Sequence, residues 1–312
     1  MNNKKLISTL LIVLLGFGVF AAVPKVSAAD DTVNFGYVQW PGVTIKTHVA
    51  AKVAEYLGYE TEMTAASQAI IFKSLETEDL DAFLGNWLPT MKMHFDEYQE
   101  KGVVHNVRVN LEDVTYRTAV PEYVYEAGVK SLADLQEHAD KFNSEIYGIE
   151  PGNDGNIIIQ DAIDNDTYNL GDWSIRESST AGMLSSVQRA YDNEEWIAFN
   201  GWKPHYMNVL FDLKYLEDPE GIWGEDDKVH TVARNSYQDE NPNFYKFLEQ
   251  FAVPAPVQNQ WIDEYQNKDR DPEEVAEEWI ANNLDIVNQW VFGVETTDGR
   301  MGRKAIAEIV NN

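Results

Sequence analysis

Four aromatic side chains occur where predicted elements begin or end, rather than inside periodic runs. Trp40 ends the first predicted strand, and Trp87 and Trp202 each follow a short buried apolar run. Tyr116 opens an extended segment. Because the carboxyl ends of parallel strands line the ligand crevice in α/β proteins, the three tryptophans fall where small molecules bind.

A short motif recurs around two of these tryptophans. The sequence Gly-Asn-Trp-Leu-Pro fills positions 85–89, and Gly-Trp-Lys-Pro fills positions 201–204. Glycine loosens the backbone and proline restrains it, so the motif predicts a tryptophan presented from a turn rather than buried in a sheet. Trp279 and Trp290 lie within helical runs and are expected to be packing residues.

A ring of aromatic side chains suits one kind of ligand especially well. A trimethylammonium group has no N–H to donate, and its positive charge is spread over methyl surfaces. Hydrogen-bonding residues cannot recognise it, whereas each aromatic face contributes roughly 0.5–2 kcal/mol when desolvated. The pattern therefore predicts a cage for a quaternary-ammonium compound.

Catalytic and metal-binding patterns are missing from the sequence. It has no G-x-S-x-G, H-E-x-x-H or P-loop motif, and its six histidines show no metal spacing. Asp154 lies in a glycine- and asparagine-rich stretch but lacks the alternating acids of a calcium loop. We therefore expect a binding protein with no cofactor. The alternative, an enzyme using Ser179 or Thr180, lacks an evident base.

The order of predicted elements indicates an α/β protein with two lobes and a ligand cleft between them. We expect residues 29–114 together with 213–312 to form one lobe and residues 115–212 the other. The chain would cross between the lobes near Val114 and again near Leu213. Extended segments are predicted at 33–39, 80–84, 103–109, 116–121, 146–149, 173–176 and 196–199, and helices at 43–57, 67–75, 90–100, 131–138, 156–163, 181–191, 243–252, 257–266, 272–282 and 284–292.

The first residues predict secretion. Lys4 and Lys5 precede an apolar run, and Val26-Ser27-Ala28 provides small residues for a signal peptidase, so residues 1–28 read as a signal peptide. A membrane anchor is the alternative, but polar residues and Pro24 interrupt the run. The chain has no cysteine to carry a lipid anchor, so we expect a soluble periplasmic protein.

The charge is strongly acidic. Asp and Glu number 52 against 24 Lys and Arg, giving a formal net charge of −28. Nucleic acids and anionic lipid surfaces are poor partners for such a chain. The acidity is consistent with general solubility or with a saline medium that screens self-repulsion. A monomer is the expected state for a soluble carrier.

Three stretches resemble the glycine betaine/choline substrate-binding proteins of ABC importers, most closely the periplasmic choline-binding branch. They cover residues 83–91, 147–156 and 201–205. The resemblance extends over nearly all of the chain after residue 28. It implies a two-lobed periplasmic-binding-protein fold (type II-like), joined by two hinge crossings, that closes on its ligand and delivers it to a membrane permease.

The resemblance also implies roles for particular residues. Trp40, Trp87, Tyr116 and Trp202 would form the ammonium cage. Asn153 would contact the polar end of the ligand, although its place before a predicted helix also suits a helix cap.

One departure from the choline-binding pattern concerns the polar end of the ligand. Choline-binding relatives tend to carry an aspartate two residues after the first cage tryptophan, where this chain has Gly42. Gly42 and Val43 lie at a predicted helix N-terminus, whose free N–H groups favour a carboxylate. Betaine-binding relatives also hold the carboxylate with a histidine, and the resemblance implies this role for His205. We therefore predict glycine betaine as the ligand.

Other ligands stay open on the sequence alone. If Gly42 is only a turn residue after Pro41, choline remains a candidate. Carnitine, trimethylamine N-oxide and dimethylsulfoniopropionate also present a methylated cationic head and differ only in the distal group.

Overall fold

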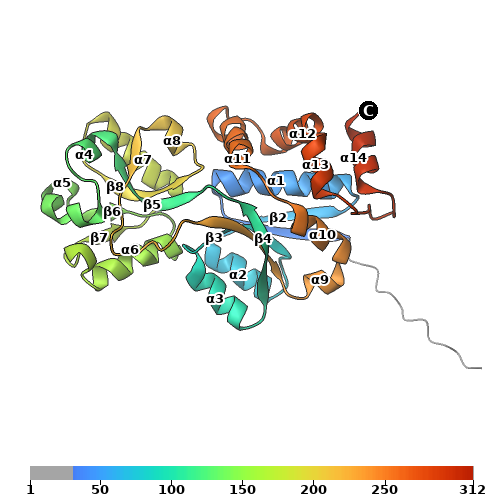
Figure 1. Ribbon diagram of the computed structural model, residues 1–312, viewed down its shortest axis with the longest axis horizontal. Coiled ribbons are helices and arrows are strands. Elements are labelled where there is room, and N and C mark those ends of the chain that lie inside the picture. Colours follow the sequence, from blue (N-terminus) through green and yellow to red (C-terminus); the bar gives the residue numbers. More distant parts are fainter. Residues whose placement is uncertain (1–30, 312) are drawn as a thin grey trace, which may run out of the picture.

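The computed structural model describes residues 31–311, so the predicted signal peptide at 1–28 lies outside the described residues. Two β-sheets with helices packed around them form two lobes, which lie side by side along the long axis of the molecule (Figure 1). Within residues 31–311, no helix is both long and apolar enough to span a bilayer.

The first sheet has the strand order β2-β1-β3-β10-β4. β1 is parallel to both of its neighbours, whereas β10 runs antiparallel to β3 and β4. The ends of β1 and β3 and the start of β10 therefore lie at one edge of the sheet. The strands span Thr32–Tyr37 (β1), Glu60–Ala65 (β2), Ala82–Leu88 (β3), Val104–Leu111 (β4) and Lys228–Arg234 (β10).

Three helices follow the strands of this first lobe: α1 (Pro41–Tyr56), α2 (Gln68–Glu76) and α3 (Lys92–Glu100). α1 begins at Pro41, where proline is favoured because the first helical N–H groups have no intrahelical partner. Most of α1 is buried, because it packs on the sheet with one side and on α11 and α12 with the other.

The second sheet has the order β7-β6-β8-β5-β9. β6 is parallel to β7 and β8, and β5 is antiparallel to β8 and β9. The segment predicted as one helix at 131–138 forms two short 3₁₀ turns instead. The elements are Thr115–Pro121 (β5), Glu122–Glu126 (α4), Ala139–Phe142 (α5), Glu145–Tyr147 (β6), Asp154–Asp164 (α6), Ser174–Arg176 (β7), Thr180–Asp192 (α7), Ala198–Lys203 (β8), Met207–Leu210 (α8) and Leu213–Tyr215 (β9).

The chain crosses between the two sheets twice. The first crossing joins β4 to β5 and includes Val114, the position expected from the sequence. The return joins β9 to β10, because Leu213, Lys214 and Tyr215 pair with β5. The second sheet therefore extends past position 212, and the expected return near Leu213 lies too early in the sequence.

Helices of the C-terminal third cover the first lobe (Figure 1). Asp271 caps α12 as its sequence predicts, accepting hydrogen bonds from the backbone N–H groups of Glu273 (2.9 Å) and Glu274 (3.2 Å). The elements are Tyr237–Glu240 (α9), Pro242–Gln250 (α10), Ala255–Ile262 (α11) with a π-turn at Asp263–Asn267, Pro272–Asn282 (α12), Leu284–Trp290 (α13) and Gly302–Val310 (α14).

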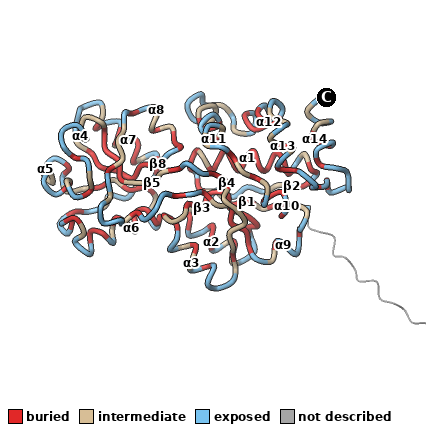
Figure 2. The backbone as a smooth tube through the Cα atoms, in the orientation of Figure 1, coloured by how far each residue is buried: buried red, intermediate tan, exposed pale blue. Residues whose placement is uncertain are grey.

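Buried hydrophobic residues form two clusters. Figure 2 shows buried positions in red in both lobes. One cluster lies between α1, its sheet and the C-terminal helices. Trp279 and Trp290 stack there with ring centroids 5.5 Å apart, which confirms them as packing residues. The other cluster runs from the first lobe into the second, and the aromatic residues of the predicted cage belong to it.

Candidate ligand-binding site

The four aromatic residues predicted to form a cage line a single cavity between the lobes. Tyr116 and Trp202 lie nearly parallel, with ring centroids 5.5 Å apart and an interplanar angle of 5°. Trp87 stands edge-on to Tyr116 at 6.3 Å. Trp40 lines the same cavity from the start of α1. The structure thus brings all four rings together, and their contact with a ligand remains a prediction.

Strand pairing explains this convergence. Trp202 is the cross-strand partner of Tyr116, and Trp87 pairs with Val229 of β10. Both tryptophans therefore lie within strands, which corrects the expectation that a turn presents them. The strand pairing reaches the two tryptophans because β5 is an antiparallel partner for β8 and β10 is an antiparallel partner for β3. Pro89 and Pro204, which have no N–H to donate, follow the last strand residues closely.

Trp40 is held by the opposite lobe. Its indole Nε1 donates to a carboxylate oxygen of Glu150 at 3.4 Å. The Glu150 carboxylate also accepts from the backbone N–H of Thr180 (2.8 Å) and from its hydroxyl (3.1 Å). One carboxylate thus joins the start of α1 to the start of α7 at the border of the cavity.

The electrostatic environment of the cavity favours a cation. Burial raises the pKa of the Tyr116 hydroxyl, and the negative charges of Glu150, Asp227 and Asp154 raise it further, so this phenol stays neutral. Burial also raises the pKa of Asp227 to about 6, against the opposing effect of Thr90, whose N–H (2.9 Å) and hydroxyl (2.8 Å) donate to it. Three carboxylates thus lie near enough to Tyr116 to act on its charge, although none of them lines the cavity itself.

The rings lie close together. The open space of the cavity is about 10 Å³, enough for about one water molecule. A trimethylammonium group therefore requires the rings to move apart, so binding should change the surroundings of several tryptophans.

Several residues of the cavity wall were not predicted. Thr90 and Met91 follow the Trp87 motif directly, so their closeness in sequence was a usable signal. Ile149 also lines the cavity. Trp223, which is 1% exposed, packs behind Tyr116 at 5.3 Å. It lies in the return crossing, where no local pattern marked it.

Asn153 caps a helix and also lines the aromatic cavity, and its contact with the ligand stays a prediction. Its side-chain oxygen caps α6 by accepting from the N–H of Gly155 at 2.9 Å, and the residue lines the aromatic cavity. Its amide nitrogen donates to Gln68 of α2 at 3.1 Å, across the boundary between lobes. A Cβ at residue 155 would lie 2.6 Å from the Tyr116 hydroxyl, so glycine there lets Tyr116 approach α6.

A second cavity lies beside the first, and Trp40, Trp87 and Trp202 form walls of both. Gly42 and Val43 line this second cavity, together with Lys46 and Gln258. Asn153 and Gly42, both predicted at the polar end of the ligand, therefore border different cavities. The remaining wall residues of the second cavity are Gly85, Leu111, Pro204 and Val229.

His205 is not among the residues lining either cavity. Its ring packs edge-on against Trp202, with centroids 4.6 Å apart. Nδ1 accepts a hydrogen bond from the N–H of Met207 at 3.2 Å, and Nε2 has no partner among the described residues. Burial lowers the pKa of His205 to about 3, so the imidazole is neutral with its proton on Nε2.

Contacts across the cleft connect α3 and α2 of one lobe to α6 of the other. The carboxylate of Asp154 pairs with Nδ1 of His94 and accepts from the side chain of Gln68 at 3.0 Å. The hydrogen bond to Asp154 raises the pKa of His94, against the opposing effect of burial. These contacts lie beside Asn153 and were not predicted.

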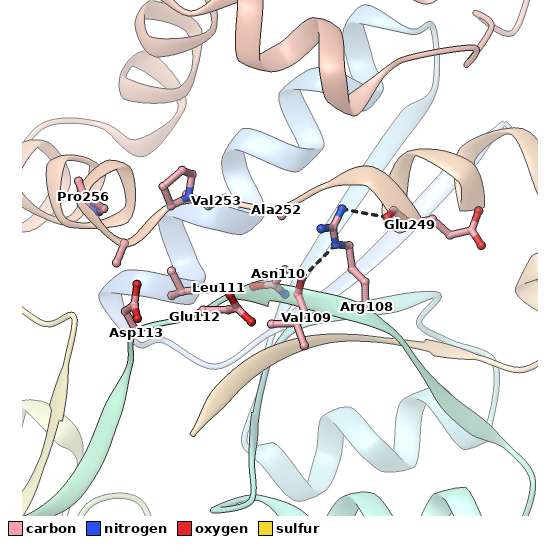
Figure 3. Close-up of a pocket in the computed structure, with 12 residues that line it drawn as sticks. Arg108, Val109, Asn110, Leu111, Glu112, Asp113, Glu249, Ala252, Val253 and Pro256 are labelled. Atoms are coloured by element: carbon pink, nitrogen blue, oxygen red, sulfur yellow. Dashed lines mark hydrogen bonds between the residues drawn. The ribbon is translucent and has the colours of Figure 1, made fainter. Parts of the chain in front are cut away.

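Another hollow, of about 740 Å³, lies away from the aromatic residues, between the end of β4 and the segment before α11 (Figure 3). The guanidinium of Arg108 is occupied there by the backbone oxygens of Val109 (3.0 Å) and Glu249 (2.9 Å). None of the residues lining this hollow is aromatic. In the described part of the chain, no three His, Cys, Asp or Glu side chains are placed to hold a metal.

Two α/β lobes with an aromatic cavity between them define a two-lobed solute-binding protein. The profile of the family described as the substrate-binding domain of ABC-type glycine betaine transport systems matches residues 31–282. The chain belongs to this family, and it is a substrate-binding protein of the glycine betaine/choline ABC transporter group. The predicted family and two-lobed α/β fold are thereby confirmed.

Solved structures and a curated relative agree with this assignment. An ABC-transporter choline-binding protein in complex with choline is 37% identical, with a TM-score of 0.87 over 90% of this chain and 98% of that one. Lactococcal OpuAC, closed on glycine betaine, is 29% identical, with a TM-score of 0.77 over 83% and 98%. The glycine betaine/carnitine transport binding protein GbuC of Listeria monocytogenes is 38% identical over 51% of this chain and 53% of its own length.

Proposed function

We propose that this protein captures glycine betaine between its lobes and delivers it to the permease of an ABC importer. The observation that carries the proposal is the single cavity walled by Trp40, Trp87, Tyr116 and Trp202. Cation–π contacts with these rings would hold the trimethylammonium group. The carboxylates of Glu150, Asp154 and Asp227, which raise the pKa of Tyr116, add long-range attraction for its positive charge.

The choice of glycine betaine rests on the second cavity. The start of α1 faces it with Gly42 and Val43, where a helix N-terminus attracts an anion. The alternative ligand is choline, which is supported by the 37% identity to a choline-binding protein. His205 takes part only if Trp202 moves aside, because the imidazole packs behind that ring.

Catalysis has no support in the same cleft. The hydroxyl of Ser179 caps α7 by accepting from the N–H of Gly182 at 3.1 Å, and that of Thr180 donates to Glu150. Both hydroxyls thus have structural partners. The Glu150 carboxylate, which accepts from Thr180, also accepts from the Trp40 indole and so helps to orient that ring. We therefore assign a carrier and not an enzyme of osmolyte metabolism.

The periplasm is the proposed location, and a monomer the proposed state. The sequence pattern of a cleaved leader at 1–28 and the lack of a cysteine for lipid attachment support this location. Purification from the periplasmic fraction, with the N-terminus read by Edman degradation, would test it.

The binding assignment is tested by titrating the purified protein with glycine betaine and with choline, following tryptophan fluorescence and heat. Replacing Trp87 by alanine should weaken binding by roughly 2- to 30-fold, the contribution of one desolvated ring. Trp196→Ala is the matched control, because Trp196 packs on Phe142 in the second lobe at 5.3 Å. If neither ligand produces a signal at millimolar concentration, the proposed function is wrong.

A further inference from the structure

A buried lysine borders the second cavity. Lys46 of α1 is 2% exposed, and its ammonium lies 2.6 Å from the side-chain oxygen of Asn110 and 3.5 Å from the backbone oxygen of Leu84. Both partners are neutral. Lysine is almost never fully buried without a compensating charge, because desolvation of the ammonium is costly.

A carboxylate partner is missing although acids are plentiful. The chain has 52 Asp and Glu, yet Lys46 takes part in none of the ion pairs of residues 31–311. Lys52, two turns later on α1, is surrounded by Glu55 (2.8 Å), Glu273 (2.6 Å) and Glu277 (3.1 Å). The same helix thus carries one fully compensated lysine and one that faces a cavity instead.

The groups facing Lys46 from neighbouring elements are uncharged and do not titrate. β3, β4, β10 and α11 all pack around this cavity. They contribute Gly85, Trp87, Asn110, Leu111, Val229 and Gln258. Burial alone lowers the pKa of Lys46, to about 7.

The position of Lys46 relative to the cage is suited to a ligand with two ends. Gly42 and Lys46 are four residues apart on α1, so they share one face of the helix. The cavity that both line is bordered by Trp40, Trp87 and Trp202, which also wall the cage. A molecule held by these rings can therefore place its other end beside the Lys46 ammonium.

We propose that Lys46 is the specificity-determining residue for the anionic end of the ligand, and that the second cavity receives the carboxylate of a zwitterionic quaternary ammonium. This inference rests on the proposed function and deepens it. Lys46 supplies the counter-charge that makes a carboxylate acceptable in a buried site, and the N-terminus of α1 adds its N–H groups. Choline has no anion to offer and gains nothing from this ammonium.

Proton uptake follows from the same geometry. Burial lowers the pKa of Lys46 to about 7, so the free protein holds both neutral and charged forms of this side chain near neutral pH, and a bound carboxylate favours the ammonium form. Binding of glycine betaine near pH 7 should therefore be accompanied by proton uptake. Affinity should be highest at low pH and fall as pH rises through the pKa of Lys46 in the free protein.

The test is calorimetric titration of the full mature protein with glycine betaine and choline at pH 7 and pH 9. Two buffers with different ionisation enthalpies report the proton uptake. Lys46→Met should abolish the uptake and flatten the pH dependence, and should weaken betaine binding at pH 7 by about thirtyfold or more. If the methionine variant does not fold, Lys46→Gln replaces it in the same measurements, because glutamine has no titrating group and can keep a hydrogen bond to Asn110.

A control separates Lys46 from other titrating groups. His94 and Asp227 also lie near the cage and have shifted pKa values, so wild-type pH dependence alone does not identify the lysine. Lys52→Met removes a lysine from the same helix away from the cavity and should leave the proton uptake unchanged.

The outcomes are distinct. Betaine-specific proton uptake that disappears with Lys46→Met supports the proposal. Tight betaine binding without proton uptake, unchanged in Lys46→Met, overturns it and leaves the proposed function intact. Absence of binding by either ligand to the wild type overturns the proposed function and this inference together.

Discussion

In the proposed site, residue 42 controls which charge can approach the start of α1. A Cβ built on Gly42 would lie 3.5 Å from Ile262 and 3.7 Å from Gln258, which is ordinary contact. A side chain therefore fits there, and the helix position requires no special backbone conformation. The lack of a side chain keeps the N-terminus of α1 free for a carboxylate.

Gly42→Asp should shift the preference from glycine betaine toward choline. The new carboxylate would pair with the N-terminus of α1 and repel the carboxylate of betaine, weakening betaine binding by about tenfold or more. Calorimetry with both ligands measures the change. Gly42→Asn has nearly the same shape without the charge, so equal losses in both variants would mean that size and not charge is responsible.

At the residue scale, the sequence predicted which rings meet but not how the chain holds them. Trp40, Trp87, Tyr116 and Trp202 could be selected because each stands at an element boundary. Their strand setting was missed, because the ladder depends on partners far away in sequence, such as Val229 opposite Trp87.

Lys46 and His205 show the limit of residue-level patterns. Lys46 has the sequence pattern of an ordinary lysine on an amphipathic helix, and only the folded structure shows its ammonium buried beside Leu84 of β3 and Asn110 of β4. The sequence alone predicts that His205 is free to contact a ligand. Its packing against Trp202 depends on the fold of the second lobe and could not be predicted.

Among the elements, α3 and α6 form the contact that connects the two lobes beside the cage. His94 and Asp154 pair there, with side chains 16% and 1% exposed. The carboxylate raises the pKa of His94, and the neighbouring Glu97 adds to this effect. A raised histidine pKa stabilises the folded form fully below the ordinary value of about 6.5, and the stabilisation is lost as pH rises through the raised value.

His94→Gln should therefore cost more stability at pH 5.5 than at pH 8.5. The expected loss at low pH is about 1.5–3 kcal/mol, the range for a hydrogen bond to a charged group. Urea denaturation of both proteins at both pH values measures it. His138→Gln is the control, because His138 packs on Trp196 at 5.1 Å in the second lobe. A loss that is equal at both pH values would contradict the account.

Helices and strands with strong local patterns were predicted well, and those defined by tertiary pairing were not. α12 was located by its Asp271-Pro272 start. β2 was missed because four of the six residues in Glu60–Ala65 are polar and five of the six are exposed, so the strand has no alternating apolar pattern. β10 was missed although it lies between β3 and β4, because its partners come from the first half of the chain.

At the scale of the whole molecule, two features affect stability. The lobes share one hydrophobic cluster, and the chain has a net charge of −28. The shared cluster includes the four aromatic residues of the proposed cage, so these rings pack against the cores of both lobes. The acidic charge repels itself, and salt screens that repulsion.

Raising sodium chloride from about 0.05 M to about 1 M, where the screening length falls from above 10 Å to about 3 Å, should raise the melting temperature. Differential scanning calorimetry of the mature protein measures it, with sucrose at equal osmolality as the uncharged control. A melting temperature that falls with salt would show that ion pairs such as Arg234–Asp81, and not net repulsion, dominate the electrostatics.

The most direct test of the central claim is a crystal structure of the protein with glycine betaine. We expect the trimethylammonium group between Trp40, Trp87, Tyr116 and Trp202, with the carboxylate toward Gly42 and Lys46. Density for the ligand in any other position, such as the hollow between β4 and α11, would contradict the account.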